Sequence, residues 1–335
     1  MKSVELLPGS GQVGSLWWDG DELVDLVGGG RRWQLDGAAR DTSIRWGHPF
    51  DQAVVSPSGR YAVIYVERGT KGIVVDLSGP KVVREIDRSY YHSSDYDYPV
   101  ALGQLPDGRE ILVHCPEHYN ELQIDDLETG QRLTEGARQS ADVFHSRLAV
   151  SPDGRHLLVA GWLWAPLGVA LAYDLAAALA DPGALDEDTM LHPFAGIDAE
   201  VASACWLDGD RLALATTDES LEWDETPALG TRQLGVWSLS QRRWLHHSAV
   251  DYRIGSLLAR GSQVVSLYDH PQLIDTETGT VIAQWPEVRV PEKDGAFGVT
   301  HIPTPVAAIS PDGTRLAVAQ EDGIALIELP NHERS

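Results

Sequence analysis

The sequence predicts an all-β fold made of one repeated unit, on three observations. An apolar strand, a tight turn with glycine and a second apolar strand recur seven times along the 335 residues. Further apolar runs follow these hairpins as a third strand and, in several copies, a fourth. The turn glycines recur every 39 to 55 residues, at Gly20, Gly59, Gly108, Gly154, Gly209, Gly261 and Gly313. Seven units of four strands predict a seven-bladed β-propeller that forms a single domain over residues 1–335.

The turns have the residues that a β-hairpin requires. At 151–154 and 310–313 the turn reads Ser-Pro-Asp-Gly, and the other copies are degenerate. Proline presets φ at the first corner, aspartate accepts hydrogen bonds from the backbone, and glycine supplies a positive φ. The flanking strands are nearly continuous in apolar residues, which is typical of strands covered on both faces.

The third and fourth strands follow from the runs after each hairpin. Third strands are expected within 72–77, 121–130, 168–175, 233–240, 272–279 and 323–329. Fourth strands are expected at 81–86, 131–136 and 280–285. An alanine-rich insertion at 175–188 interrupts the fourth unit, and there we expect one or two helical turns.

The two ends of the chain complement each other. The last unit stops after its third strand, and residues 3–7 form an unpaired strand ahead of the first hairpin. If residues 3–7 supply the outer strand of the seventh blade, the ring closes without an open edge. We therefore expect a severe loss of thermal stability when residues 1–9 are deleted.

One uncharged segment, 157–173, is as long as a short membrane span. It contains Pro166 and two glycines, and Asp174 follows it directly. The repeat pattern instead predicts two buried strands and their connection. The N-terminus has no secretory signal, so we expect a cytoplasmic protein.

Charge and cysteine content exclude several classes of function. Lys+Arg number 26 and Asp+Glu number 50, a net charge of −24. With no basic excess, we expect neither nucleic acid nor an anionic membrane as partner. Cys115 and Cys205 cannot form a disulfide framework or a thiolate zinc site, and Cys115 is expected to be a buried thiol. The scarcity of lysine indicates a bacterial source, and we expect a monomer.

Propeller geometry gathers the long loops on one face. Loops between the second and third strands, and between one blade and the next, emerge on the same side of the ring. Such loops on a rigid scaffold are preferred binding sites. The long irregular ones are 88–98, 116–120, 161–167, 217–231 and 286–303.

The predicted binding residues on this long-loop face are aromatic residues and histidines. Tyrosine, tryptophan and histidine offer a large contact area with a polar group attached. The acidic segment 219–226 favours a basic partner. The predicted residues are His48, Tyr91, His92, Tyr96, His118, Tyr119, His145, Trp162, Trp164, Trp223, His270 and His301.

The repeat resembles that of bacterial WD-repeat-like propellers, which the Ser-Pro-Asp-Gly turns at 151–154 and 310–313 mark. The Trp-Asp pair that ends the third strand of WD repeats is replaced here, for example by Tyr173-Asp174 and Trp237-Ser238. This resemblance implies a non-enzymatic scaffold that presents its long-loop face to a protein or peptide partner.

Two alternatives use the same face. One is a propeller enzyme of lactonase, lyase or hydrolase type, and the other is a sensor of a small ligand or metal. Both require histidines and carboxylates to converge at the channel mouth, from among His48, His92, His118, His145 and His301. No compact metal-binding spacing, nucleophile elbow or phosphate loop occurs, so no catalytic residue, metal or cofactor is predicted. A flat aromatic face would favour the scaffold.

Overall fold

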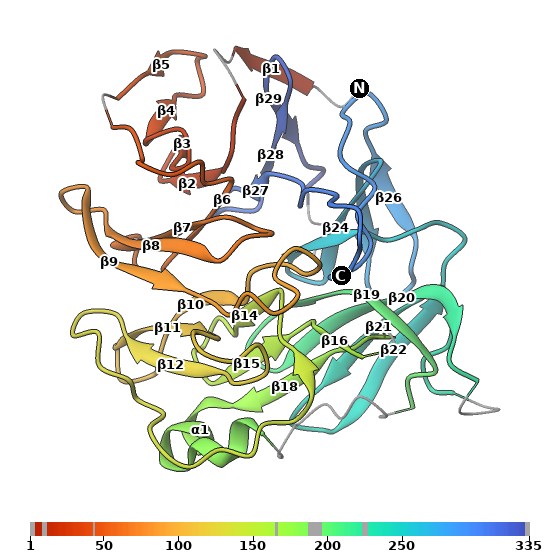
Figure 1. Ribbon diagram of the computed structural model, residues 1–335. Coiled ribbons are helices and arrows are strands. Elements are labelled where there is room, and N and C mark those ends of the chain that lie inside the picture. The colour runs from red at the N-terminus through yellow and green to blue at the C-terminus, as the bar shows by residue number, and fades with distance from the viewer. Residues whose placement is uncertain are drawn as a thin grey trace.

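The computed structural model describes residues 4–8, 12–42, 44–164, 167–186, 196–222 and 227–331. These residues are nearly all in strands and turns, with one short α-helix, α1 (Leu175–Ala180), and one 3-10 helix, η1 (Pro182–Leu185). In the described chain the strands form eight antiparallel sheets. The sheets are arranged around a common centre, with the first and last strands side by side (Figure 1). The all-β prediction is confirmed.

Five sheets have four strands. In order of hydrogen-bonded neighbours they are β2 (Trp17–Asp19), β3 (Glu22–Asp25), β4 (Arg31–Trp33) and β5 (Ala39–Arg40); β6 (Gln52–Val55), β7 (Tyr61–Tyr65), β8 (Lys71–Asp76) and β9 (Lys81–Asp87); β19 (Ala199–Trp206), β20 (Arg211–Ser220), β21 (Gln233–Ser238) and β22 (Arg243–Ala249); β23 (Ser256–Arg260), β24 (Gln263–Tyr268), β25 (His270–Asp275) and β26 (Val281–Gln284); and β1 (Val4–Pro8), β29 (Gly323–Glu328), β28 (Arg315–Gln320) and β27 (Ala307–Ile309).

Three sheets have three strands. They are β10 (Val100–Gln104), β11 (Glu110–His114) and β12 (Gln123–Asp126); β14 (Leu148–Val150), β15 (His156–Val159) and β18 (Leu171–Asp174); and β13 (Val143–Phe144), β16 (Trp162–Leu163) and β17 (Leu167–Gly168).

All seven predicted hairpins are present, from β2–β3 to β27–β28. Six of the seven turn glycines have a positive φ, as expected. Gly209 does not, and for this turn the prediction was wrong. The Asp208 carboxylate accepts hydrogen bonds from the backbone N–H groups of Asp210 and Arg211 at 2.8 and 2.7 Å. This side chain therefore shapes the turn without a left-handed residue.

The turn at Gly154 also brings two neighbouring sheets into close contact. Gly154 has φ 70°, and a Cβ atom there would lie 1.8 Å from the backbone oxygen of Gln104 in β10. Gly20 has φ 61° but nothing within 4 Å of such an atom.

We expect Gly154→Ala to destabilise the protein well beyond Gly20→Ala. Both substitutions place a side chain at positive φ, which costs about 1–2 kcal/mol. The backbone clash at Gly154 adds roughly 1–3 kcal/mol. Urea unfolding of the two variants checks this, and equal midpoints would contradict the close contact.

The predicted closing strand is observed. β1 pairs with β29 over its whole length, from Val4 opposite Ile327 to Pro8 opposite Gly323. Leu7 is buried in an apolar cluster that also includes Trp18 of β2. The core lies in clusters of this kind between neighbouring sheets.

The fourth strand expected at 131–136 does not form. Only an isolated bridge, between Asp125 and Arg132, extends that sheet beyond β12. The Thr134 hydroxyl accepts from the backbone N–H of Ile124, and Arg132 donates to the Thr134 carbonyl. Backbone bonds join Leu133 N–H to the Ile124 carbonyl and Asp126 N–H to the Gln131 carbonyl, at 2.7 and 2.9 Å, so the pairing is limited to this short stretch and side-chain bonds follow it at Thr134.

In the uncharged segment 157–173 the described residues, 157–164 and 167–173, fold as short strands, and these include residues of the loop expected at 161–167. β15 and β16 come from one stretch of chain that is interrupted at Gly161, and β17 and β18 follow in the same way. Similarly, β20 runs to Ser220, beyond the expected start of the loop at residue 217. Among the described residues, no helix is long and apolar enough to cross a membrane.

Candidate functional site

The candidate site begins with a stacked pair of rings in the small sheet β13–β16–β17. Phe144 of β13 lies opposite Trp162 of β16, so the two side chains share one face of the sheet. Their ring centroids are 3.9 Å apart at 12°, and both residues are almost fully buried. Tyr119, from the loop between β11 and β12, also stacks on Phe144 at 4.3 Å. This buried stack supports the other rings of the site.

Three further rings lie over this stack. Tyr91, His92 and Trp164 each have their ring centroid 6.0 Å from that of Phe144. His92 is edge-on to both Tyr91 and Trp164, at 4.6 and 5.3 Å. Tyr91 is 50% exposed and Trp164 58%. We call the whole group the aromatic platform: Tyr91, His92, Tyr96, Tyr119, Phe144, Trp162, Trp164 and Phe297.

A buried arginine organises the loop that carries Tyr91 and His92. The Arg88 guanidinium donates to the carbonyls of Gly69, Ser93 and Tyr96 at 2.6, 2.6 and 3.0 Å. It also lies over the rings of Tyr96 and Tyr98, at 4.4 and 5.0 Å from their centroids. Burial lowers the pKa of Arg88. Backbone oxygens and ring faces thus stabilise this cation and hold the loop in one shape.

His92 completes that loop. Its backbone is in the left-handed region, at φ 51°. Its Nδ1 lies 2.7 Å from Asp95 Oδ2, and this hydrogen bond lowers the pKa of Asp95. The carboxylate therefore orients the imidazole between the two exposed rings.

Residues 291–304, which we call the strap, are part of the long connection between β26 and β27. They contact the loop that follows β7 and the loop that precedes β10. Lys293 is buried, and its Nζ donates to Glu67, Asp97 and Thr304 at 2.8, 2.7 and 2.7 Å. Burial works against a charged Glu67, but the Lys293 charge and the hydrogen bonds from Lys293 and Thr304 keep its pKa below the ordinary value. The strap is therefore anchored by a buried ionic cluster.

The strap also supplies the last ring of the platform. Phe297 forms a bridge with Tyr96 and packs against Trp162, with 4.4 Å between ring centroids. Arg68 donates to the carbonyl of Gly298 at 3.1 Å. Loops from distant parts of the sequence thus meet at one patch, as the long-loop-face prediction requires.

Of the twelve predicted binding residues, the structure brings six together in the platform. These are Tyr91, His92, Tyr96, Tyr119, Trp162 and Trp164. Tyr96 and Trp162 are buried, so they support the exposed rings from below. Trp223 lies outside the described residues.

The other five predicted residues, all histidines, lie in different surroundings. His48 is exposed beside Phe50, and His118 is exposed in the loop of Tyr119. His145 is buried against the Asn120 carbonyl, and burial lowers its pKa to about 4. His270 pairs with Asp269 and His301 with Glu67.

The histidines therefore do not converge on one pocket. In the part of the chain that the structure describes, no group of three histidine, cysteine or acidic residues could hold a metal ion. Cys115 is buried, as predicted, and burial raises the pKa of its thiol, which makes it a poor nucleophile.

Sequence analysis missed Phe144, Phe297, Arg88 and Lys293. Phe144 and Phe297 are single aromatic residues without a repeated pattern. Arg88 and Lys293 stand in long polar loops, where a charge is normally solvated. Lysine is rare in this sequence, and this rarity was the only feature that set Lys293 apart from other loop residues.

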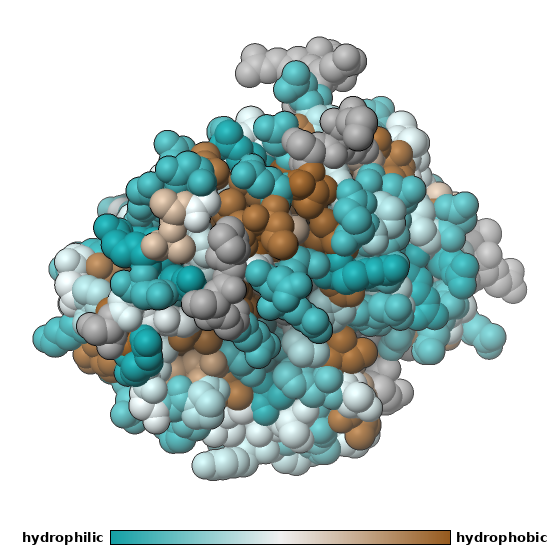
Figure 2. All heavy atoms as spheres, turned by 90° about the horizontal axis from the view of Figure 1, so that it is seen from above, coloured by the Kyte–Doolittle hydropathy of each residue, from teal (hydrophilic) through white to brown (hydrophobic). Residues whose placement is uncertain are grey.

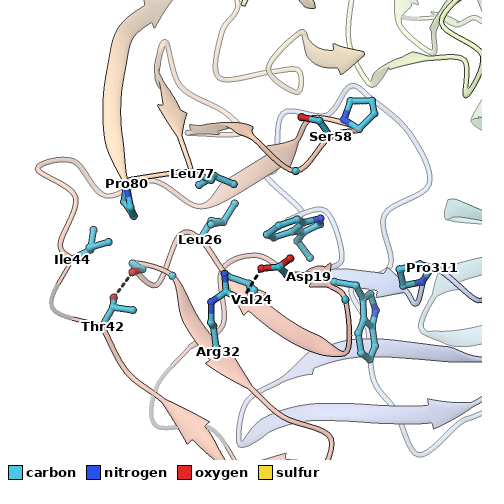
Figure 3. A pocket seen from close by; sticks show the side chains of 17 residues that line it. Asp19, Val24, Leu26, Arg32, Thr42, Ile44, Ser58, Leu77, Pro80 and Pro311 are labelled. Atoms are coloured by element: carbon cyan, nitrogen blue, oxygen red, sulfur yellow. Dashed lines mark hydrogen bonds and ion pairs between the residues drawn. The ribbon is translucent and has the colours of Figure 1, made fainter. Parts of the chain in front are cut away.

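Among the described residues, several hollows lie elsewhere on the surface, and two of them are the largest. One, of about 510 Å³, opens between the first two sheets; Leu26, Ile44 and Leu77 line it, and the Arg32–Asp19 ion pair lies at its edge (Figure 3). A larger one, of about 1130 Å³, lies beside β1 and includes Leu6. On that side of the molecule apolar side chains gather in a patch with a polar border (Figure 2). None of the predicted binding residues lines either hollow.

Comparison with known proteins identifies the fold. No protein-family model matches the sequence, and no curated protein matches it. A chain in the crystal structure of the mitotic checkpoint complex is similar, with a TM-score of 0.63 and 14% sequence identity. The match covers 98% of this chain and 95% of that chain. At this identity the likeness shows the fold alone, that of a WD-repeat-like β-propeller.

Proposed function

We propose that the chain is one seven-bladed propeller over residues 1–335. Each of the seven hairpins begins a separate sheet. The eighth sheet, β13–β16–β17, continues the strands of the fourth unit beyond a break at Ser146–Arg147 and Gly161. The Ser-Pro-Asp-Gly turns support placing it among the bacterial WD-repeat-like propellers.

This propeller acts as a non-enzymatic scaffold that binds a protein or peptide through the aromatic platform. The observation that carries the proposal is the pair of exposed rings, Tyr91 and Trp164, held over the buried Phe144–Trp162 stack. Large rings that are already fixed lose little conformational entropy on binding, which is the property of interface hot spots.

The enzyme and metal-sensor alternatives have less support. They need several histidines in one pocket, but His48, His92, His145 and His301 contact different residues, and His118 is exposed. The strap, which is part of the β26–β27 connection, is held against the loop after β7, where Lys293 meets Glu67.

The test is affinity capture with a platform variant and a matched control. Tyr91→Ala with Trp164→Ala removes the two exposed rings, and Val82→Ala with Ile282→Ala removes two exposed apolar side chains from the outer strands β9 and β26. We expect the wild type and the control to capture the same partner from a lysate of the source organism. The platform variant should bind it at least about 30-fold more weakly, with an unchanged melting curve. Capture that persists in the platform variant would show that the binding face is elsewhere.

A further inference from the structure

We infer that the aromatic platform receives an arginine side chain of the partner; this inference rests on the proposed function. The platform is built from five stretches of chain, and none of them contains a lysine or an arginine. Together they contain four carboxylates: Asp95, Glu117, Glu121 and Asp142. The stretches are 89–96, 116–121, 139–146, 161–164 and 295–302.

The cations that flank these stretches in the sequence point into the protein. Arg88 donates to backbone carbonyls in the interior, and Arg138 is paired with Asp186 with both side chains 3% exposed. Arg147 donates to the carbonyls of Ala160 and Ala202, at 2.9 and 2.5 Å. Lys293 is buried in the strap cluster described above. Glu121 is paired with Arg132 at 2.8 Å, and the buried Arg68 is paired with Asp97 at 3.0 Å. Among the described residues, Asp95, Glu117 and Asp142 form no ion pair with a lysine or an arginine, so these three leave negative charge at the platform.

Two of the carboxylates are hydrogen-bonded to platform rings. The Tyr119 hydroxyl donates to Asp142 Oδ1 at 2.5 Å, and Asp142 is exposed. Asp95 is bonded to His92 in the same way. Burial and the bond to Asp142 raise the pKa of Tyr119 to about 12, so its hydroxyl stays a neutral donor. Charge is thus fixed at the edge of the exposed ring faces.

Exposed ring faces next to fixed carboxylates are complementary to a cation. The negative face of an indole or phenol attracts a cation, and a carboxylate pairs with it. A guanidinium fits this arrangement better than an ammonium group, because it is flat, weakly hydrated and able to stack while its N–H groups reach a carboxylate. An aliphatic partner residue would use the rings but leave the carboxylates unpaired.

The experiment is isothermal titration of the full chain with synthetic peptides of glycine and serine. Each peptide carries two copies of arginine, citrulline, lysine or leucine at the same positions. Citrulline keeps the shape of arginine without its charge. We expect the arginine peptide to bind at least about tenfold more tightly than the citrulline peptide, and its affinity to fall as salt is raised.

Variants connect this binding to the platform. Trp164→Ala should weaken the arginine peptide about tenfold, and Trp164→Phe should keep part of the affinity. Asp142→Asn keeps an oxygen that can accept from Tyr119 and removes only the charge, so a loss of about threefold or more measures the electrostatic part. The Val82→Ala, Ile282→Ala control should bind as the wild type does.

Equal binding of the arginine and citrulline peptides would overturn the inference, and so would tighter binding of the leucine peptide or no binding at all. These outcomes leave the proposed function intact if partner capture is still lost in the Tyr91→Ala, Trp164→Ala variant. Persistent capture in that variant would instead reject the proposed function itself.

Discussion

Deletion of residues 1–9 should lower the melting temperature by about 10 °C or more. The deletion removes β1, which pairs with β29 over five residues. It also removes the buried Leu7 side chain and leaves β29 as an unpaired edge between the last and first units. An open edge of this kind also favours aggregation.

Two point variants measure how much of this loss comes from the buried Leu7 side chain and not from the missing strand. Leu7 is 1% exposed, and its neighbour Leu6 is 54% exposed on the opposite side of β1. Leu7→Ala should lower the free energy of unfolding by about 2–5 kcal/mol, and Leu6→Ala should lower it much less. Calorimetry of the deletion and the two variants makes the test, and an unchanged melting curve after deletion would contradict closure by β1.

The second large loss of stability is expected for Lys293→Met. Lys293 donates to Glu67 and Asp97, and the side chains of all three are 7% exposed or less. Removal of the ammonium leaves the buried Glu67 without its lysine partner, whereas Asp97 keeps Arg68 at 3.0 Å. Breaking a buried ion pair in this way costs about 3–5 kcal/mol. The matched control is Lys71→Met, which breaks a pair with Asp87 of which about half of each side chain is exposed. That change should cost less than about 1 kcal/mol.

The pH dependence of the melting temperature shows whether Lys293→Met destabilises the protein through lost charge pairing or through lost packing. In the wild type the pKa of Glu67 is below its ordinary value, so the stability it contributes is present at neutral pH and is lost as pH falls through the folded pKa. In Lys293→Met that pKa should rise, because burial then acts without the opposing cation. The difference in melting temperature between variant and wild type should therefore shrink from pH 8 to pH 5. A constant difference would mean that lost packing, and not the Glu67 carboxylate left without Lys293, causes the loss of stability.

Much of the architecture could be predicted because its signals are local. Hairpins around Gly59 and Gly154 depend on four or five consecutive residues whose chemistry determines the turn. The expected strand at 131–136 shows the limit of such patterns. Its pairing with β12 stops after Leu133, where the Thr134 hydroxyl takes the Ile124 N–H, and hydrophobicity does not show such a change of partner.

For the candidate site, the sequence predicted the types of residue but not how they pack together. Aromatic loops were expected on one face, and Tyr91, Tyr119 and Trp164 do meet there. Their common support, Phe144, was not recognised, because its contact with Trp162 depends on the exact register of β13 and β16. A shift of one residue would turn either ring to the other side of the sheet.

The sequence by itself therefore determined the repeat, the hairpins and the closing strand, since each follows from neighbouring residues or from the pattern of apolar runs. Tertiary structure alone decided which loops meet. Lys293 and Glu67 are 226 residues apart, and no local pattern indicates that they share a buried hydrogen bond. The acidic excess is likewise a property of composition, but only the folded chain turns Arg88, Arg138 and Lys293 inward and leaves Asp142 exposed beside Tyr119. Burial of a charge is possible only where the folded chain supplies its partners.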